Sequence, residues 1–116
     1  MPSVTLELSE ELKARVEPFS RWLSAILELS LLALKTPASG AASELIEFLI
    51  SNPSPGEVQT YQLPTWSQER VGALLERNRS AGLSDAETRE LDEYLKLEHA
   101  VRLIKAKLTS DELASA

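Results

Sequence analysis

The sequence has no cysteine and a single histidine, His99, among its 116 residues. Without cysteine the chain can form neither a disulfide framework nor a thiolate metal site, so we expect a protein of the reducing cytoplasm. One imidazole without other ligands at a suitable spacing does not indicate a metal centre, and His99 is expected to be a partly exposed helix residue. The sequence therefore predicts no metal and no cofactor.

Catalytic signatures are equally scarce. The four glycines are scattered at positions 40, 56, 72 and 82, so the sequence contains no GxGxxG motif and no Walker-type loop. The acidic pairs Glu10-Glu11 and Asp92-Glu93 are interpreted as solvated helix faces, because adjacent helical residues point a quarter-turn or more apart. We predict that the chain is not an enzyme and has no small-molecule substrate.

Positive charge is in the minority. Twelve basic side chains face 18 acidic ones, which gives a net charge of -6 and opposes attraction to nucleic acid or to anionic membranes. The amino terminus has no basic region followed by an apolar core, and Glu28 and Ser30 interrupt the densest apolar stretch, Ile26 to Leu34. We therefore expect no signal peptide and no membrane span.

The first residues alternate between polar and apolar side chains, which is the period-two pattern of a half-buried strand. Its apolar face consists of Val4, Leu6 and Leu8, and its polar face of Ser3, Thr5 and Glu7. A lone strand cannot satisfy its backbone groups in a small helical chain, and no second convincing alternation lies nearby. We predict that this strand pairs with the same strand of a second copy.

A helix capped by Ser9 and limited by Pro18 is expected next, followed by a second helix from Ser20 to about Lys35. The second helix carries large apolar groups on nearly every side, so it needs contacts all round. A chain of 116 residues supplies a small core, and a second subunit would most easily bury this helix. The predicted dimer interface therefore combines the apolar strand face with Trp22, Ile26 and Leu29.

The remaining segments also read as helices separated by breaks. Residues 36–40 indicate a linker, residues 43–51 a brief helix and residues 52–56 a loop. The pattern Thr65-Trp66-Ser67-Gln68 matches a capping box that would start a helix reaching about Arg79, and Ser84 to Glu87 repeats the signal. Apolar residues up to Leu108 then form one stripe, so residues 65–108 predict an antiparallel helical hairpin.

Several stretches carry a resemblance to a known family. The succession of strand, short helix and longer apolar helix resembles the ribbon-helix-helix module of bacterial antitoxins and small repressors. The chain is more particularly similar to a bacterial antitoxin-like family. The stretches that carry this similarity are Ile26-Leu27-Glu28-Leu29, Ser43-Glu44-Leu45-Ile46-Glu47-Phe48-Leu49, Asn52-Pro53-Ser54-Pro55-Gly56-Glu57, Leu75-Glu76-Arg77-Asn78-Arg79, Leu83-Ser84 and Tyr94-Leu95-Lys96-Leu97-Glu98-His99-Ala100-Val101-Arg102.

The resemblance implies a mainly α fold in three parts. Residues 1–36 would form a dimeric ribbon-helix-helix-like segment, residues 37–64 a linker with one short helix, and residues 65–116 a helical hairpin arm with a frayed tail. Members of the family are often regarded as partners of PIN-domain ribonucleases, so the arm would cover such a toxin. The candidate partner-binding residues are Trp66, Arg70, Tyr94 and Arg102.

The sequence departs from the resemblance where DNA would be read. Ribbon-helix-helix proteins contact the major groove with outward strand residues, which here are Ser3, Thr5 and Glu7. No basic residue precedes Lys13, and Glu7 would repel phosphate, so operator binding is disfavoured. Three hypotheses remain: an antitoxin that neutralises a ribonuclease, a ribbon-helix-helix regulator that binds DNA, and a non-catalytic structural subunit of a larger complex.

Overall fold

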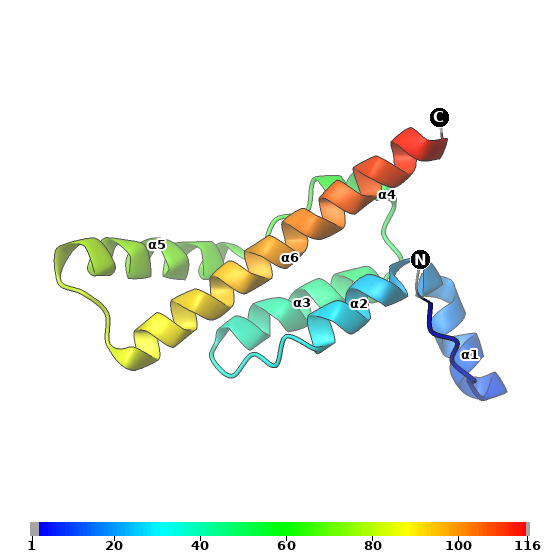
Figure 1. The fold of residues 1–116 in the computed structure, drawn as a ribbon, viewed down its shortest axis with the longest axis horizontal. Helices are drawn as coiled ribbons and strands as arrows, with labels where there is room; N and C mark the ends of the chain where they lie inside the picture. Colours follow the sequence, from blue (N-terminus) through cyan, green and yellow to red (C-terminus); the bar gives the residue numbers. More distant parts are fainter. Residues whose placement is uncertain (1–2, 116) are drawn as a thin grey trace.

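A 31-residue helix, α6 (Asp85–Ser115), runs along the molecule, and α2, α3, α4 and α5 contact it (Figure 1). The computed structural model describes residues 3–115, with side chains described for residues 3–110. The other elements are α1 (Glu10–Val16), the 3-10 helix η1 (Glu17–Trp22), α2 (Leu23–Ser30), α3 (Ala38–Ile50), α4 (Pro55–Gln59) and α5 (Thr65–Ser80).

The predicted amino-terminal strand is wrong. Residues 3–9 are irregular, and no strand occurs anywhere between residues 3 and 115, so the ribbon-helix-helix-like fold class is corrected to an all-helical one. The alternating pattern alone does not make a strand, because a ladder needs a second edge and this single chain offers none. The chain belongs to the mainly α class on its helices alone.

The second predicted helix is shorter and starts differently than expected. It begins as the 3-10 helix η1, continues as α2 and ends at Ser30 rather than near Lys35. Ala33 has a φ of +52°, a left-handed conformation that no helix interior contains, and it reverses the chain toward α3. This reversal lays α3 beside α2, so both helices face α6 (Figure 1).

The main hydrophobic cluster lies among α2, α3, α4 and α6. Trp22, Ile26 and Leu29 are buried in it, although they were predicted to face a second subunit. The indole Nε1 of Trp22 donates a hydrogen bond to the carbonyl oxygen of Pro53 at 3.1 Å. The assignment of these three residues to a dimer interface is therefore corrected, because α3 and α6 of the same chain already cover them. Their partners in the cluster include Ala41, Ala42, Leu45, Leu49, Val58, Leu97 and Leu108.

A second cluster joins α5 to the first half of α6. The two helices run in opposite directions from their short connection and form the helical pair expected over residues 65–108 (Figure 1). Their buried contacts are Ala38, Val71, Leu74, Leu91 and Tyr94. Since α6 contributes to both clusters, it joins the α5 end of the molecule to the α2 and α3 end.

Of the two predicted capping boxes, the one at Ser84 forms and the one at Thr65 does not. Ser84 and Glu87 form the predicted capping box, with the Glu87 amide donating to the Ser84 Oγ at 3.1 Å and the Ser84 amide to Glu87 Oε1 at 3.0 Å. The predicted box at Thr65 is wrong, because Thr65 is already helical and the preceding residue is Pro64. A capping box exists instead between Ser54 and Glu57, where it starts α4 inside the segment predicted as a loop.

Candidate protein-binding surfaces

The amino-terminal arm, residues 3–16, exposes apolar side chains. It comprises the irregular residues 3–9 and α1, and α1 contains no buried residue. Val4 is 87% exposed, Leu8 38% and Leu12 43%. The Ser9 Oγ accepts a hydrogen bond from the Leu12 amide at 3.1 Å, so local capping starts α1 without help from packing. Because α1 contains no buried residue, its apolar side chains have no cover within this chain. A seven-residue helix is marginally stable in water unless such a face is covered.

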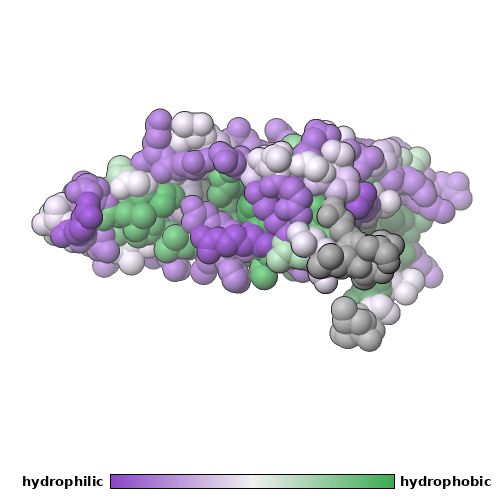
Figure 2. All heavy atoms as spheres, turned by 90° about the horizontal axis from the view of Figure 1, so that it is seen from above, coloured by the Kyte–Doolittle hydropathy of each residue, from purple (hydrophilic) through white to green (hydrophobic). Residues whose placement is uncertain are grey.

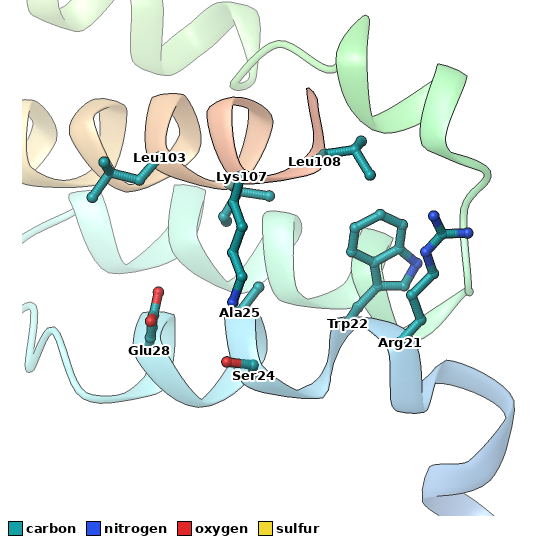
Figure 3. A pocket seen from close by; sticks show the side chains of 9 residues that line it. Arg21, Trp22, Ser24, Ala25, Glu28, Leu103, Lys107 and Leu108 are labelled. Atoms are coloured by element: carbon teal, nitrogen blue, oxygen red, sulfur yellow. The ribbon is translucent and has the colours of Figure 1, made fainter. Parts of the chain in front are cut away.

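A groove of about 300 Å³ separates α2 from the carboxyl-terminal half of α6. In Figure 3, Arg21 and Trp22 lie at one end, and Lys107 reaches from α6 toward α2 beside Ala25. The Arg21 guanidinium lies 5.2 Å from the centre of the Trp22 ring, which is the range of a cation-π contact. The groove, called here the α2–α6 groove, is lined by Arg21, Trp22, Ser24, Ala25, Glu28, Leu103, Ile104, Lys107 and Leu108.

A second, shallow hollow lies between the first turns of α5 and the middle of α6. Leu75, 50% exposed, stands at its edge, and the Glu98–Arg102 ion pair at 3.7 Å lies opposite on α6. Figure 2 shows hydrophobic residues on the surface next to the end that carries the α5–α6 connection, framed by hydrophilic ones. We call the hollow between α5 and α6 the α5–α6 face, and its lining residues are Gln62, Leu63, Gln68, Val71, Gly72, Leu75, Glu98, Val101 and Arg102.

The four predicted partner-binding residues have different positions. Trp66 is exposed on α5 and donates from Nε1 to Glu44 Oε2 at 3.0 Å, and Arg102 is exposed on α6. Tyr94 is fully buried in the α5–α6 cluster, so its assignment as a surface anchor is corrected. It belongs to the apolar stripe that holds the helical pair together, and a stripe residue faces its neighbouring helix.

Arg70, the remaining candidate, forms a two-pronged ion pair within the chain. Its Nε donates to Glu90 Oε2 at 2.8 Å and its Nη2 to Glu90 Oε1 at 2.9 Å. The hydrogen bonds from Arg70 outweigh burial and lower the pKa of Glu90, while the same pairing raises the pKa of Arg70. Burial and the neighbouring Glu90 charge raise the pKa of Tyr94. Arg70 therefore fixes α5 on α6 and is already occupied.

Glu93 links α6 to the start of α3. Its Oε1 accepts hydrogen bonds from the Lys35 amide at 2.7 Å, the Thr36 amide at 3.0 Å and the Thr36 hydroxyl at 3.0 Å. Burial raises the pKa of Glu93, but these donors outweigh burial and the pKa is lowered. The interpretation of Asp92-Glu93 as a solvated pair is therefore wrong for Glu93, which is buried, and holds for Asp92, which is exposed.

The predicted DNA-reading residues lie exposed on the irregular part of the arm. Ser3, Thr5 and Glu7 belong to no strand, so the two-stranded ribbon that would carry them into a major groove is absent from residues 3–115. His99 is exposed on α6, and among the described residues no group of three or more histidine and acidic side chains could hold a metal ion. Within the same residues, no helix is both long and apolar enough to cross a membrane.

No protein-family model, no curated protein and no solved structure matches this chain. The resemblance to antitoxin-like proteins therefore stays a prediction. The α2–α6 groove was not predicted, because its two walls are more than 70 residues apart in the sequence. The sequence predicted the helices on either side of the groove but not their contact. Periodicity shows that a helix has an apolar face, and it does not show which other helix covers that face.

Proposed function

We propose that the protein is a non-catalytic binding module that holds a partner protein on its α5–α6 face, as an antitoxin-like inhibitor would. The observation that carries the proposal is the exposed Leu75 beside an apolar hollow whose rim carries the Glu98–Arg102 pair. Interfaces of this kind combine a desolvated apolar centre with arginine at its edge. A partner segment with an apolar side chain for the hollow and a carboxylate for Arg102 would fit.

The form of the face favours a protein over a small ligand. The hollow is shallow and open, whereas sites for small ligands are concave enough to bury most of the ligand. The face is also held in place before binding, because the Arg70–Glu90 pair and the buried Leu74 fix α5 against α6. A preformed face loses little conformational entropy on association. The resemblance makes a PIN-domain ribonuclease the first partner to test.

The proposal is tested by co-expression with the product of the neighbouring gene, followed by affinity purification and a toxicity assay. We expect Leu75→Asp and Arg102→Glu each to weaken binding at least tenfold, because both place a charge against the centre or edge of the interface. Leu27→Asp is the matched control, since Leu27 is 48% exposed on α2, away from the face. Binding that survives both face variants, or a toxin that the protein leaves active, would contradict the proposal.

A further inference from the structure

We propose that the amino-terminal arm of one copy fills the α2–α6 groove of a second copy, and that the exchange is reciprocal. The arm has apolar side chains without a cover, and the groove has apolar walls without an occupant from its own chain. Each chain thus carries both halves of the contact. This dimer differs from the predicted strand ribbon, because a helical arm enters a groove and no strands pair.

The size of the groove matches two leucine side chains. A cavity of roughly 150 Å³ holds one benzene-sized group, so about 300 Å³ holds two groups of that order. Leu8 and Leu12 are four residues apart on either side of the Ser9 cap, and both are partly exposed. The Ser9 cap fixes the backbone between Leu8 and Leu12 and thereby the position of the two side chains relative to each other. We assign them to the floor formed by Ala25, Ile104 and Leu108.

Charge complements this apolar fit. Around the two leucines the arm carries Glu7, Glu10 and Glu11, and its two basic residues, Lys13 and Arg15, lie farther along α1. The groove offers Arg21 at one end and Lys107 across its middle, with Glu28 as the single opposing charge (Figure 3). Because the carboxylates of the arm surround its leucines and its cations lie toward η1, placing the carboxylates near Arg21 and Lys107 orients the arm along the groove.

The arm is held away from the groove of its own chain. Helix α1 continues into η1 without an intervening loop, and a kink at Phe19, with φ of -121° and ψ of 22°, turns the chain between α1 and α2. In Figure 1, α1 points away from α6 and projects from the body of its own chain, whereas residues 3–9 turn back along α1. A second copy can receive it without any change in α1. Reciprocal exchange of this kind gives a closed, two-fold symmetric pair.

The first experiment measures the mass of the intact chain by sedimentation equilibrium over a range of concentrations. We expect a dimer, and we expect Leu8→Asp/Leu12→Asp to raise its dissociation constant by at least about 100-fold. Leu27→Asp is again the control, because it replaces an exposed leucine outside the groove by the same charged residue. Circular dichroism of the variants confirms that they fold, since the two arm residues lie outside both core clusters.

A mixing experiment identifies the contact. Ser24→Trp places a ring in the groove from an exposed position, so this variant keeps its arm and loses its groove. The Leu8→Asp/Leu12→Asp variant keeps its groove and loses its arm. Each variant alone should be monomeric, whereas an equimolar mixture should form a heterodimer with one intact contact.

Three results would overturn the proposal: a monomeric wild type, a dimer that survives both variants, or a mixture that stays monomeric. A monomer whose residues 3–12 are protected from hydrogen exchange would place the arm in its own groove and would equally exclude exchange between copies. Partner binding at the α5–α6 face is measured separately with Leu75→Asp, so failure of one proposal leaves the other standing.

Discussion

The Glu93 carboxylate shows how much one side chain organises in this fold. A single oxygen accepts three hydrogen bonds from Lys35 and Thr36, and the Thr36 hydroxyl accepts in turn from the Ala38 amide at the start of α3. Since α3 has no side-chain cap at Pro37, this connection performs the work of a cap from a distant helix. The charge of Glu93 is thus part of the fold.

We predict that Glu93→Ala lowers the free energy of unfolding by about 2 kcal/mol, because the part-buried amide groups of Lys35 and Thr36 lose their acceptor. Glu93→Gln should lose about half as much, since its amide oxygen still accepts. Urea denaturation at neutral pH measures both. Equal losses for the two variants would show that charge alone matters.

The lowered pKa values of Glu90 and Glu93 also predict how stability depends on pH. A carboxyl group whose pKa is lower in the folded state stabilises it above the unfolded pKa, and this contribution is lost as the pH falls through the folded value. The midpoint of urea denaturation should therefore fall on acidification below about pH 4.5. Glu93→Gln should flatten this dependence, and an unchanged slope would show that Glu93 does not contribute to it.

Replacing Gly72 and Gly82 by alanine should have opposite effects on stability. Gly72 lies inside α5, where an added Cβ meets no atom within 4 Å, whereas Gly82 follows the C-cap residue of α5 with a φ of +83°. We predict that Gly72→Ala stabilises the protein by about 0.8 kcal/mol and that Gly82→Ala destabilises it by about 1 kcal/mol. Thermal unfolding of the two variants should shift in opposite directions. Shifts of the same sign would contradict this assignment.

At the scale of elements, local signals predicted where some helices begin and missed others. The box at Ser84 was read correctly, because serine and glutamate three residues apart stabilise a helix start wherever the chain is free to form one. The same pattern at Ser54, followed by Pro55 at the first helical position, was interpreted as a loop because of its prolines. Proline at that position favours a helix start, so the sequence did contain the signal for α4.

Local signals could not predict which elements cover the apolar faces of the helices. The apolar face of Trp22, Ile26 and Leu29 was correctly expected to be covered, but α3 and α6 cover it and not a second subunit. The start of α3 was missed because its buried residues there are Ala38, Ala41 and Ala42, which give little apolar periodicity. The α2–α6 groove depends on this long-range packing and was therefore invisible to sequence reasoning. Trp66 and Arg102 are exposed and Tyr94 is buried, so partner binding by Trp66 and Arg102 stays a prediction.

The capping box of α4 gives a prediction at this scale. Ser54→Ala should lower the free energy of unfolding by about 1 kcal/mol, because the Glu57 amide loses the serine oxygen that it donates to at 3.2 Å. Thr65→Ala is the control and should change stability by less, since Thr65 is the first residue of α5 and α5 has no side-chain cap. Chemical denaturation of the two variants under one condition makes the comparison. A larger loss for the threonine variant would contradict the cap assignment.

On the scale of the whole molecule, α6 makes two clusters into one unit. Leu97 and Leu108 enter the main cluster, whereas Leu91 and Tyr94 enter the α5 cluster, and Leu34 contacts both. A continuous helix transmits a loss in one cluster to the other. We therefore expect the two clusters to unfold in a single cooperative transition.

This expectation is tested with Leu74→Ala, which removes a fully buried side chain from the α5 cluster alone. The variant should lose about 3 kcal/mol of stability. In a Trp66→Phe background, the fluorescence of Trp22 reports on the main cluster. The denaturation curve measured by this fluorescence should show the same loss of unfolding free energy as the whole protein. A Trp22 transition that stays at the original denaturant concentration would show that the clusters melt independently.

The connection from Glu93 to Thr36 has a consequence for synthesis of the chain in the cell. The partners of α2 and α3 that complete the main cluster, Leu97 and Leu108, are translated after everything that they cover. Until α6 leaves the ribosome, α6 cannot cover the apolar sides of α2 and α3, and the amides before α3 lack the Glu93 carboxylate as acceptor. We therefore expect the first half of the nascent polypeptide to expose apolar surface, of the kind that chaperones bind, until α6 emerges.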